Sequence, residues 1–375
     1  MMLPLDGLVV LDLAQYLAGP SAALRLADLG ARVIKVERPG SGDGSRQMRL
    51  RDRQLDGDSL LFHTINRGKE SLTIDLRDPK DHARLVDLIR HTDVLIHSFR
   101  PGALERYSLD YDTAAAINPR LVYAHVTGYG EQGRWAQNPG QDLLVQARTG
   151  LTWLNGRSDD PPAPMALSVV DHLAGALLVQ GILACLFRRN TTDKGGLVQV
   201  SLLEAAMDLQ FEVFTGYLNH GGTPHRSAVS AGHPDIGAPY GIYQTSDGWL
   251  ALAMGPLHQL VQLVGIPGDP MEIAGTPFTD RDDIKRRLAD VLIGRTTQEW
   301  TAILEPAGYW CAEVLDWPAL EKSGALDTLS VVVTCGETDR TFRTTRSPVR
   351  IDGQPLPATG AAPRLGAHSP LPGDA

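Results

Sequence analysis

An aspartate in the middle of the chain is the side chain best placed for covalent chemistry. Asp171 follows the apolar stretch Met165–Val170 and stands before a second apolar stretch, Leu173–Phe187. Aspartate is a favoured helix cap, so an ordinary structural role is one interpretation. The other is chemical, because a helix N-terminus favours an ionised carboxylate, the form that acts as a nucleophile. Neighbours at a helix start point in different directions, so His172 is predicted to be a bystander.

Arg38 is a second candidate, for binding rather than for catalysis. It directly follows a predicted strand, Val33–Glu37. A guanidinium at the C-terminal edge of a strand is well placed for a phosphate or an adenine ring. A surface ion pair is the alternative for an arginine that stands alone.

The elements around these residues alternate between strand and helix. The first forty residues indicate a strand at Leu8–Leu13, a turn at Ala18–Pro20, a helix that Ser21 caps and Gly30 ends, and a strand at Val33–Glu37. The pattern predicts an α/β fold with a doubly wound parallel sheet. It continues through predicted strands at Leu72–Leu76, Asp93–Phe99 and Leu121–Thr127 and a helix at Pro79–His91.

The first turn argues against a dinucleotide cofactor. An NAD-binding fold needs the pattern GxGxxG there, so that the backbone can approach a pyrophosphate. The turn in this chain is Leu17-Ala18-Gly19-Pro20, which cannot supply that loop. A dinucleotide enzyme is therefore a weak alternative.

Changes in amino-acid composition and pattern along the chain predict its domains. Residues 1–215 are expected to form a large α/β domain, and a Gly-, Pro-, His- and Ser-rich stretch at 216–239 a linker or loop. Residues 240–318 are expected to form a smaller α+β domain, with a hairpin around Ser246-Asp247-Gly248. Residues 319–375 should return to the large domain, with an extended tail from about 355. Helices of the smaller domain are predicted at about Pro256–Val264, Arg281–Ile293 and Thr297–Glu305.

Composition excludes several classes of protein. The chain has 375 residues, 43% hydrophobic and 21% charged, as expected for a folded globular protein. Its net charge of −9 argues against nucleic-acid binding, although a local arginine cluster can still hold a small anion. The eleven histidines include no HExxH or similar pattern, and no metal site is predicted.

Cysteine usage and the apolar segments bear on the location of the protein. Three widely spaced cysteines and the absence of a recognisable signal peptide predict a reducing, cytoplasmic setting without disulfides. The stretch Leu173–Phe187 is shorter than the roughly 18 residues of a membrane span. It is predicted to be a buried helix, so no membrane partner is expected.

A series of short motifs runs in order along nearly the whole chain. The motifs lie in Leu5–Leu13, Leu17–Pro20, Ala27–Ala31, Val33–Pro39, Asn66–Leu72, Ser98–Gly102, Asn118–Leu121, Gly128–Gly130, Val198–Ala205 and Pro239–Tyr243. Together they resemble the family III coenzyme A transferases, the group of formyl-CoA transferase, carnitine CoA-transferase and α-methylacyl-CoA racemase. Each motif alone is modest evidence, and their order makes the resemblance strong.

The resemblance implies a coenzyme A site on the large domain. The adenine end would contact Arg38 and the residues around Leu17. Arginines near the nucleotide can gather positive charge for a polyanion, with surface ion pairs as the alternative for some of them. The binding residues that the resemblance implies are Tyr16, Leu17, Ala18, Arg38, Ile74, Asp75, Arg77, Ser98, Phe99, Arg100, Arg106 and Gln141.

The resemblance also assigns roles near the reacting group. Asp171 matches the family's catalytic aspartate, which attacks the acyl group. Asp142 falls where the transferases carry an acidic residue, to orient groups or handle a proton, with a structural cap as the alternative. Gln141 lies in the segment where the racemase branch has an acid/base histidine. Glutamine has no useful pKa, which favours transfer over racemisation.

The predicted activity is transfer of coenzyme A from an acyl-CoA to a carboxylic acid, through an aspartyl anhydride and an aspartyl-CoA thioester. Coenzyme A enters as a substrate, and no permanently bound cofactor is expected. A racemase or isomerase of the same family and a non-catalytic acyl-CoA-binding protein are the alternatives. The resemblance further implies an interlocked homodimer and a glycine-rich loop that shields the intermediates. Only His220-Gly221-Gly222 and Ser230–Gly237 can supply such a loop here, so the identities of the acids stay open.

Overall fold

The computed structural model describes residues 2–220, 222–335, 340–358 and 360–368. Gly221, in one of the two predicted shielding loops, lies outside the described residues. The chain divides into two compact units. The large unit comprises Met1–Val145, Leu167–Leu209 and Gly324–Ala375, and the small unit Gln146–Ala166 and Gln210–Ser323.

The predicted domain boundaries differ from these units in three segments. Residues 319–323 belong to the small unit, whereas the prediction gives them to the segment that returns to the large domain. Residues 146–166 and 210–239 belong to the small unit, whereas the prediction gives 146–215 to the large domain and 216–239 to a linker. As statements about domains, the boundaries at 215, 239 and 318 remain predictions.

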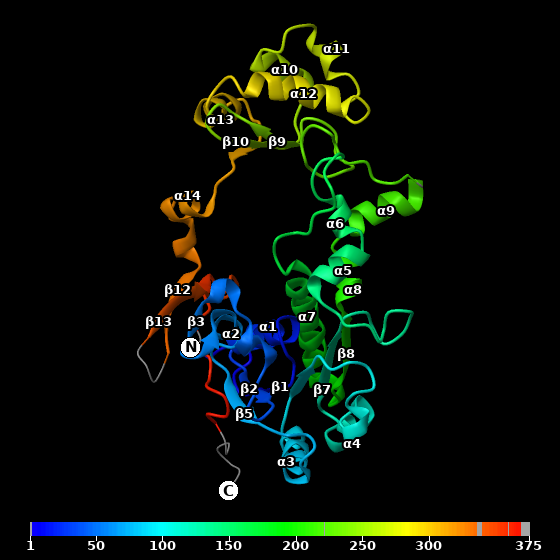
Figure 1. Cartoon of the computed structure of the whole chain (residues 1–375), viewed down its shortest axis with the longest axis vertical. Helices are drawn as coiled ribbons and strands as arrows, with labels where there is room; N and C mark the ends of the chain where they lie inside the picture. The colour runs from blue at the N-terminus through cyan, green and yellow to red at the C-terminus, as the bar shows by residue number, and fades with distance from the viewer. Residues whose placement is uncertain (1, 221, 336–339, 359, 369–375) are drawn as a thin grey trace. The chain divides into compact units, whose positions relative to one another are not determined.

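A six-stranded parallel sheet forms the centre of the large unit, in the order β5-β2-β1-β6-β7-β8 (Figure 1). The predicted parallel sheet is therefore confirmed. The strand order reverses between β1 and β6, and open α/β sheets bind ligands outside the carboxyl ends of their strands at such a point. The strands are β1 (Val9–Asp12), β2 (Arg32–Glu37), β5 (Glu70–Thr73), β6 (Val94–His97), β7 (Val122–Thr127) and β8 (Gly196–Ser201).

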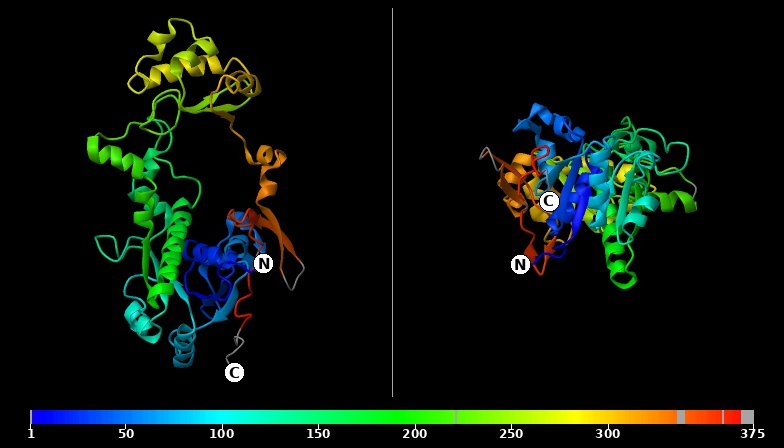
Figure 2. Two further views of the ribbon diagram at one scale, coloured as in Figure 1. Left: turned by 180° about the vertical axis from the view of Figure 1, so that it is seen from behind. Right: turned by 90° about the horizontal axis from the view of Figure 1, so that it is seen from below.

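Helices cover both faces of this sheet (Figure 1 and Figure 2). On one face, α1 (Ala18–Asp28) packs against α7 (Val169–Thr192). On the other, α3 (Pro79–Arg90) and α4 (Tyr111–Ile117) contribute to a shared apolar core with the strands. Strands that are buried on both faces are apolar along nearly their whole length, as β6 and β7 are here.

Helix α1 begins one turn earlier than predicted. Leu17 precedes the helix, and its carbonyl accepts the N–H of Ser21. Pro20 lies in the first turn, where its missing N–H leaves no bond unmade. The prediction that Ser21 caps the helix is therefore wrong, and its hydroxyl donates to the carbonyl of Ala18 instead. The helix ends before Gly30, whose φ of 106° suits a glycine, as predicted.

Helix α7 is longer than the predicted Leu173–Phe187. It spans 24 residues and begins after Ser168, so Asp171 is its third residue and not its cap. Among the described residues it alone is long and apolar enough to cross a membrane by length and composition. One side of it packs on α1, β7 and β8, but only about 33% of its most apolar stretch is buried, so the predicted buried helix is confirmed for that side alone.

Helices α1 and α7 approach each other closely at Gly175. A Cβ there would lie 2.5 Å from the hydroxyl oxygen of Ser21 and 2.8 Å from the carbonyl oxygen of Ala18. Only a glycine permits this approach without a shift of the backbone. The first turn of α7 is thereby held beside the start of α1, which directly follows the β1 loop.

The small unit has an antiparallel sheet with the order β11-β10-β9. The predicted hairpin is confirmed, because β9 and β10 pair on either side of Ser246-Asp247-Gly248. The helices predicted in this region are also confirmed, within one residue at each end. The elements are β9 (Gly241–Gln244), β10 (Trp249–Leu252), β11 (Cys311–Glu313), α10 (Leu257–Val264), α11 (Pro270–Ala274), α12 (Arg281–Leu292) and α13 (Thr297–Leu304).

The C-terminal segment belongs to the large unit, with a hairpin of β12 (Ser330–Thr334) and β13 (Thr341–Thr345). The described tail then runs beside β5, where the N–H groups of Gly366 and His368 bond to Ser71.

Candidate functional site

A pocket of about 210 Å³ opens at the carboxyl ends of the sheet strands, entirely within the large unit. Its walls are the segments that follow β1, β2, β5 and β6, and so it spans the point where the strand order reverses. Ligand pockets commonly measure about 300–1,000 Å³. The pocket is therefore suited to one end of a long ligand.

Half of the predicted binding residues line this pocket. They are Arg38, Ile74, Asp75, Arg77, Phe99 and Arg106. The other six, Tyr16, Leu17, Ala18, Ser98, Arg100 and Gln141, are not part of its wall.

The residues outside the wall have identifiable places. The Ser98 hydroxyl accepts the N–H of Gln15, so it supports the wall from outside. Leu17 and Ala18 form the start of α1. Arg100 and Gln141 are exposed.

The arginines give the pocket its positive charge. Arg77 is paired with Asp75, with 3.1 Å between Nε and Oδ1. Arg38 and Arg106 are exposed and form no ion pair within the described ranges of the chain. Two guanidiniums are therefore available to an anion in the pocket.

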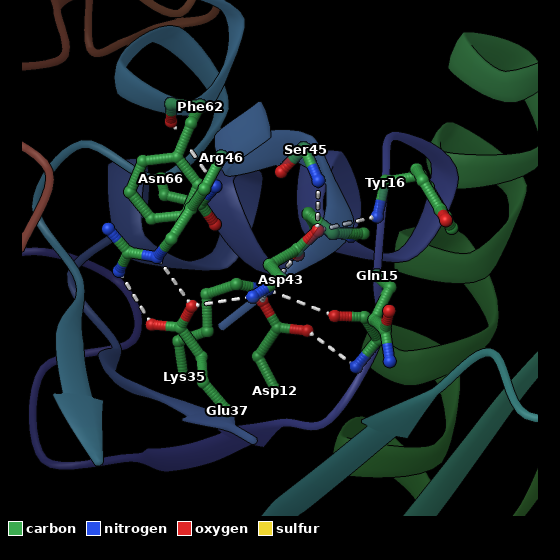
Figure 3. Close-up of polar contacts among 12 residues, drawn as sticks. Asp12, Gln15, Tyr16, Lys35, Glu37, Asp43, Ser45, Arg46, Phe62 and Asn66 are labelled. Atoms are coloured by element: carbon green, nitrogen blue, oxygen red, sulfur yellow. Dashed lines mark hydrogen bonds and ion pairs between the residues drawn. The ribbon is translucent and has the colours of Figure 1, made fainter. Parts of the chain in front are cut away.

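Sequence reasoning missed a buried set of charges, of which Lys35 and Asp43 border the pocket (Figure 3). The Lys35 ammonium lies 2.7 Å from Asp43 and 3.6 Å from Asp12. Lys69 lies 2.8 Å from the same Asp12 oxygen and also donates to Asn66. All four charged side chains are buried, and two lysines balance two aspartates. The detectable signal was a lysine within the apolar strand Val33–Glu37, because lysine is rarely buried without a partner.

The two lysines of this set differ in their proton affinity. Burial lowers the pKa of Lys69 to about 8; Asp12 opposes that change and the charge of Lys35 adds to it. Burial also acts to lower the pKa of Lys35, but the carboxylates of Asp12 and Asp43 outweigh it and raise the pKa above its ordinary value. Lys35, which faces two carboxylates, is therefore held as a cation.

Asp142 caps α7 from outside the helix. Its Oδ2 accepts the N–H of Val170 at 2.8 Å and the N–H of Asp171 at 3.0 Å. The N–H of His172 bonds to the carbonyl of Ser168. These amides are consequently not available to the carboxylate of Asp171, and the capping role that Asp171 was a candidate for belongs to Asp142.

The carboxyl group of Asp171 has no polar partner among the described residues. Within the described part of the chain it forms no hydrogen bond and no ion pair. Burial, and then the negative charge of Asp142, raise the pKa of Asp171 to about 7. The expectation that the helix start keeps this group ionised is therefore wrong, because Asp142 occupies the amides and adds a like charge. A strongly shifted pKa is common at functional sites.

Asp171 and the pocket are linked through one packing contact. The α1–α7 crossing at Gly175 lies one turn after Asp171. The α1 side of this crossing, Ala18 and Ser21, follows the pocket-lining residues Leu13–Gln15 by a few residues. The pocket and the carboxyl group thus belong to one packed assembly of β1, α1 and α7.

The other predicted features near the site are inconspicuous. His172 is exposed. No group of His, Cys, Asp and Glu within the described ranges is arranged to hold a metal ion. A cavity of about 810 Å³ in the small unit lies on β9–β11 and has no arginine or lysine in its wall, so it does not suit a polyanion.

Comparison with known proteins identifies the family of the chain. The model of the family "CoA-transferase family III" matches residues 5–369. The chain belongs to this family. It is a CoA-transferase, and coenzyme A thioesters are its substrates and not resident cofactors.

Characterised relatives and a solved structure cover most of the chain. An acetyl-CoA:oxalate CoA-transferase of Acetobacter aceti is 33% identical over 322 residues, 84% of this chain and 81% of that protein. A probable fatty acyl-CoA transferase of Mycobacterium tuberculosis is 30% identical over 383 residues, 98% of this chain and 96% of that protein. The crystal structure of a CAIB/BAIF family protein from Brucella suis superposes with a TM-score of 0.82 at 29% identity, covering 98% of both chains.

Proposed function

We propose that this CoA-transferase exchanges coenzyme A between two carboxylic acids with Asp171 as the nucleophile. One observation carries the proposal: Asp171 is a partly buried carboxyl group with a pKa of about 7 and no partner among the described residues. It lies at the end of α7 that packs on α1, the helix that follows the β1 loop of the pocket. A carboxylate with few partners and a pKa near neutrality is both available and reactive at physiological pH.

The reaction proceeds by two exchanges, the first at the acyl carbon of the donor thioester and the second at the carboxyl carbon of Asp171. Its carboxylate attacks the donor thioester carbonyl, the C–S bond breaks, and an acyl–aspartyl anhydride and coenzyme A thiolate result. The thiolate then attacks the Asp171 carbonyl of the anhydride and releases the donor acid. The acceptor acid reverses these steps. One thioester replaces another, so the exchange needs no other source of energy.

The other site residues bind and position. Arg38 and Arg106 hold phosphates of the coenzyme, and the other predicted binding residues in the wall, Ile74, Asp75, Arg77 and Phe99, hold its nucleotide end. Asp142 fixes the backbone at Asp171. Its negative charge also keeps the carboxylate of Asp171 from being stabilised so strongly that it loses reactivity. Exclusion of water protects the anhydride, which would otherwise hydrolyse.

We also propose an interlocked homodimer in the cytoplasm, with a smaller second domain. Several large apolar side chains are well exposed in the single chain, and a second subunit would cover some of them. They are Phe187, Leu218, Trp310 and Trp317. Light scattering should give twice the mass of one chain; a monomer at micromolar concentration would contradict the dimer.

Trapping tests the nucleophile directly. The protein is incubated with acyl-CoAs that range from oxalyl-CoA to long-chain fatty acyl-CoA, because the relatives' names include both oxalate and fatty acyl groups. Hydroxylamine or borohydride then captures the intermediate, and mass spectrometry locates it. The adduct is expected on Asp171. An unmodified Asp171 across the whole panel counts against transfer.

The same preparation separates the alternatives. Asp171→Ala should bind coenzyme A and lose turnover. If this variant still bound acyl-CoA and kept the biological effect of the native protein, a non-catalytic acyl-CoA-binding protein would be favoured. Deuterium exchange at the acyl α-carbon in the absence of an acceptor acid would favour a racemase.

A further inference from the structure

Tyr16 has a backbone conformation that its residue type rarely adopts. Its φ is 67°, in the left-handed region that favours glycine. Its ring lies against Gly44, where a Cβ would come within 2.8 Å of the phenol atoms. Such strain costs of order 1 kcal/mol or more and persists only where neighbouring groups impose it. The side chain is 55% exposed, so burial of the ring does not account for the conformation.

Asp43 is the group that imposes it. Its Oδ1 accepts the N–H of Tyr16 at 3.1 Å and the N–H of Ser45 at 2.8 Å (Figure 3). The carboxylate therefore joins the loop after β1 to the loop after β2. Both loops contribute to the pocket wall, through Leu13–Gln15 and through Gly42 and Asp43.

Lys35 holds Asp43 in turn. Its ammonium lies 2.7 Å from Asp43 Oδ2, donates to the Ala14 carbonyl at 2.9 Å, and lies 3.6 Å from Asp12. The contact with the Ala14 carbonyl is a hydrogen bond, and the two carboxylates are ion-pair partners that balance the charge of the ammonium. Lys35 is also completely buried, with 0% of its side chain exposed. Although it borders the pocket, its charge is balanced inside the protein by the carboxylates of Asp43 and Asp12.

We propose that Lys35 and Asp43 are positioning residues for coenzyme A. They set the Ala14–Tyr16 loop, of which Ala14 and Gln15 line the pocket, in its binding geometry without touching the ligand. The proposal rests on the proposed function for the identity of the ligand. Lys35 fixes the Ala14 carbonyl directly and Tyr16 through Asp43. The strained loop is thereby already formed before coenzyme A binds. The free-energy cost of ordering the loop therefore does not weaken binding.

The competing explanation is that these buried charges only stabilise the fold. The large unit offers a matched control for that, the buried pair Arg67–Asp28, 2.6 Å apart and outside the pocket wall. Breaking either pair leaves a buried charge without its partner, which is destabilising. Only the Lys35–Asp43 pair should also affect binding.

The test compares Lys35→Met, Asp43→Asn and the control Asp28→Asn. Calorimetry measures the Kd for coenzyme A, and thermal unfolding measures stability. Lys35→Met and Asp43→Asn should each raise the Kd about tenfold, whereas Asp28→Asn should lower the Tm and leave the Kd unchanged. At saturating donor, the rate of Asp171 labelling should change less than threefold in either pocket variant, because positioning acts before the chemical step. Asp43→Asn keeps the shape of the side chain and serves if Lys35→Met does not fold.

The double variant decides whether Lys35 acts through Asp43. Its Kd should be no higher than that of the weaker-binding single variant, because both substitutions interrupt the same interaction between Lys35 and Asp43. Multiplied effects, or a Kd like that of the native protein in both single variants, would overturn the inference. Failure of the native protein itself to bind coenzyme A would instead refute the proposed function.

Discussion

At the scale of single residues, the ionisation of Asp171 sets when the protein can react. Its pKa of about 7 means that roughly half of the molecules carry the nucleophilic form at neutral pH. The single-turnover rate of Asp171 labelling at low donor concentration should therefore rise with pH and level off above about 8. Rapid-quench trapping between pH 5.5 and 8.5 measures it. A rate independent of pH over this range would show that the group is already ionised.

The same shift makes a prediction for stability. A carboxyl whose folded pKa lies above its unfolded value of 3.8 opposes folding more strongly as pH rises from about 4 to about 7. Asp171→Asn removes this penalty and should stabilise the free protein at pH 8 by roughly 1–2 kcal/mol. Urea unfolding at pH 8 and pH 4.5 checks it, and the gain should shrink at the lower pH. Destabilisation by Asp171→Asn at both pH values would contradict the pKa assignment.

At this scale, the sequence predicts a residue's role only where neighbouring residues in the chain determine that role. Asp171 and Arg38 were recognisable because each stands at the end of a predicted element. The contact between Asp142 and the amide of Asp171 spans 29 residues of sequence, and no periodicity indicates it. Lys35 was visible as a charge within an apolar strand, but only the fold shows which carboxylates balance it.

At the scale of elements, α7 is positioned by a cap that comes from α5 (Asp142–Arg148). The cap contributes in two separable ways, as a hydrogen-bond acceptor and as a negative charge. Asp142→Asn keeps the acceptor and removes the charge, so the pH at which Asp171 labelling reaches half its maximum should fall. Asp142→Ala removes both and should also destabilise the protein by about 1–2 kcal/mol. Labelling profiles and urea unfolding of the two variants measure this.

A result in which both variants leave the labelling profile where it was would show that burial alone raises the pKa of Asp171. Equal stability of Asp142→Asn and Asp142→Ala would show that the two hydrogen bonds to α7 contribute little.

The strands and most helices followed from hydrophobic periodicity, and the errors have identifiable causes. The start of α1 was missed because Ala18-Gly19-Pro20 has the composition of a turn, whereas proline is tolerated in a helix's first turn. The start of α7 was missed because its cap is a distant side chain and no local capping residue marks it.

At the scale of the whole molecule, the sequence predicted two parts but not how the chain alternates between them. Residues 146–166 belong to the small unit although their neighbours on both sides belong to the large one. Local pattern reports which residues form an element, and not which core that element joins. Asp142 and Asp171 both belong to the large unit, and residues 146–166 of the small unit lie between them in the sequence.

The completeness of the pocket within the large unit leads to a final prediction. Coenzyme A should slow amide exchange in the segments after β1, β2, β5 and β6, because their backbones form the wall and a ligand that binds only the folded state suppresses local opening. Hydrogen–deuterium exchange with mass spectrometry measures it, with the β12–β13 hairpin of the same unit as the internal control, since it lines no part of the pocket. At 100 times the Kd the stabilisation is about 2.7 kcal/mol, which corresponds to about a hundredfold slower exchange wherever opening releases the ligand. Before the ligand is added, the Ala14–Tyr16 segment of the Lys35→Met variant should exchange faster than that of the native protein, because its loop is no longer formed in advance. Equal protection of that segment in the native protein and in the variant would mean that the strain at Tyr16 is held by the chain around it and not by the buried charges.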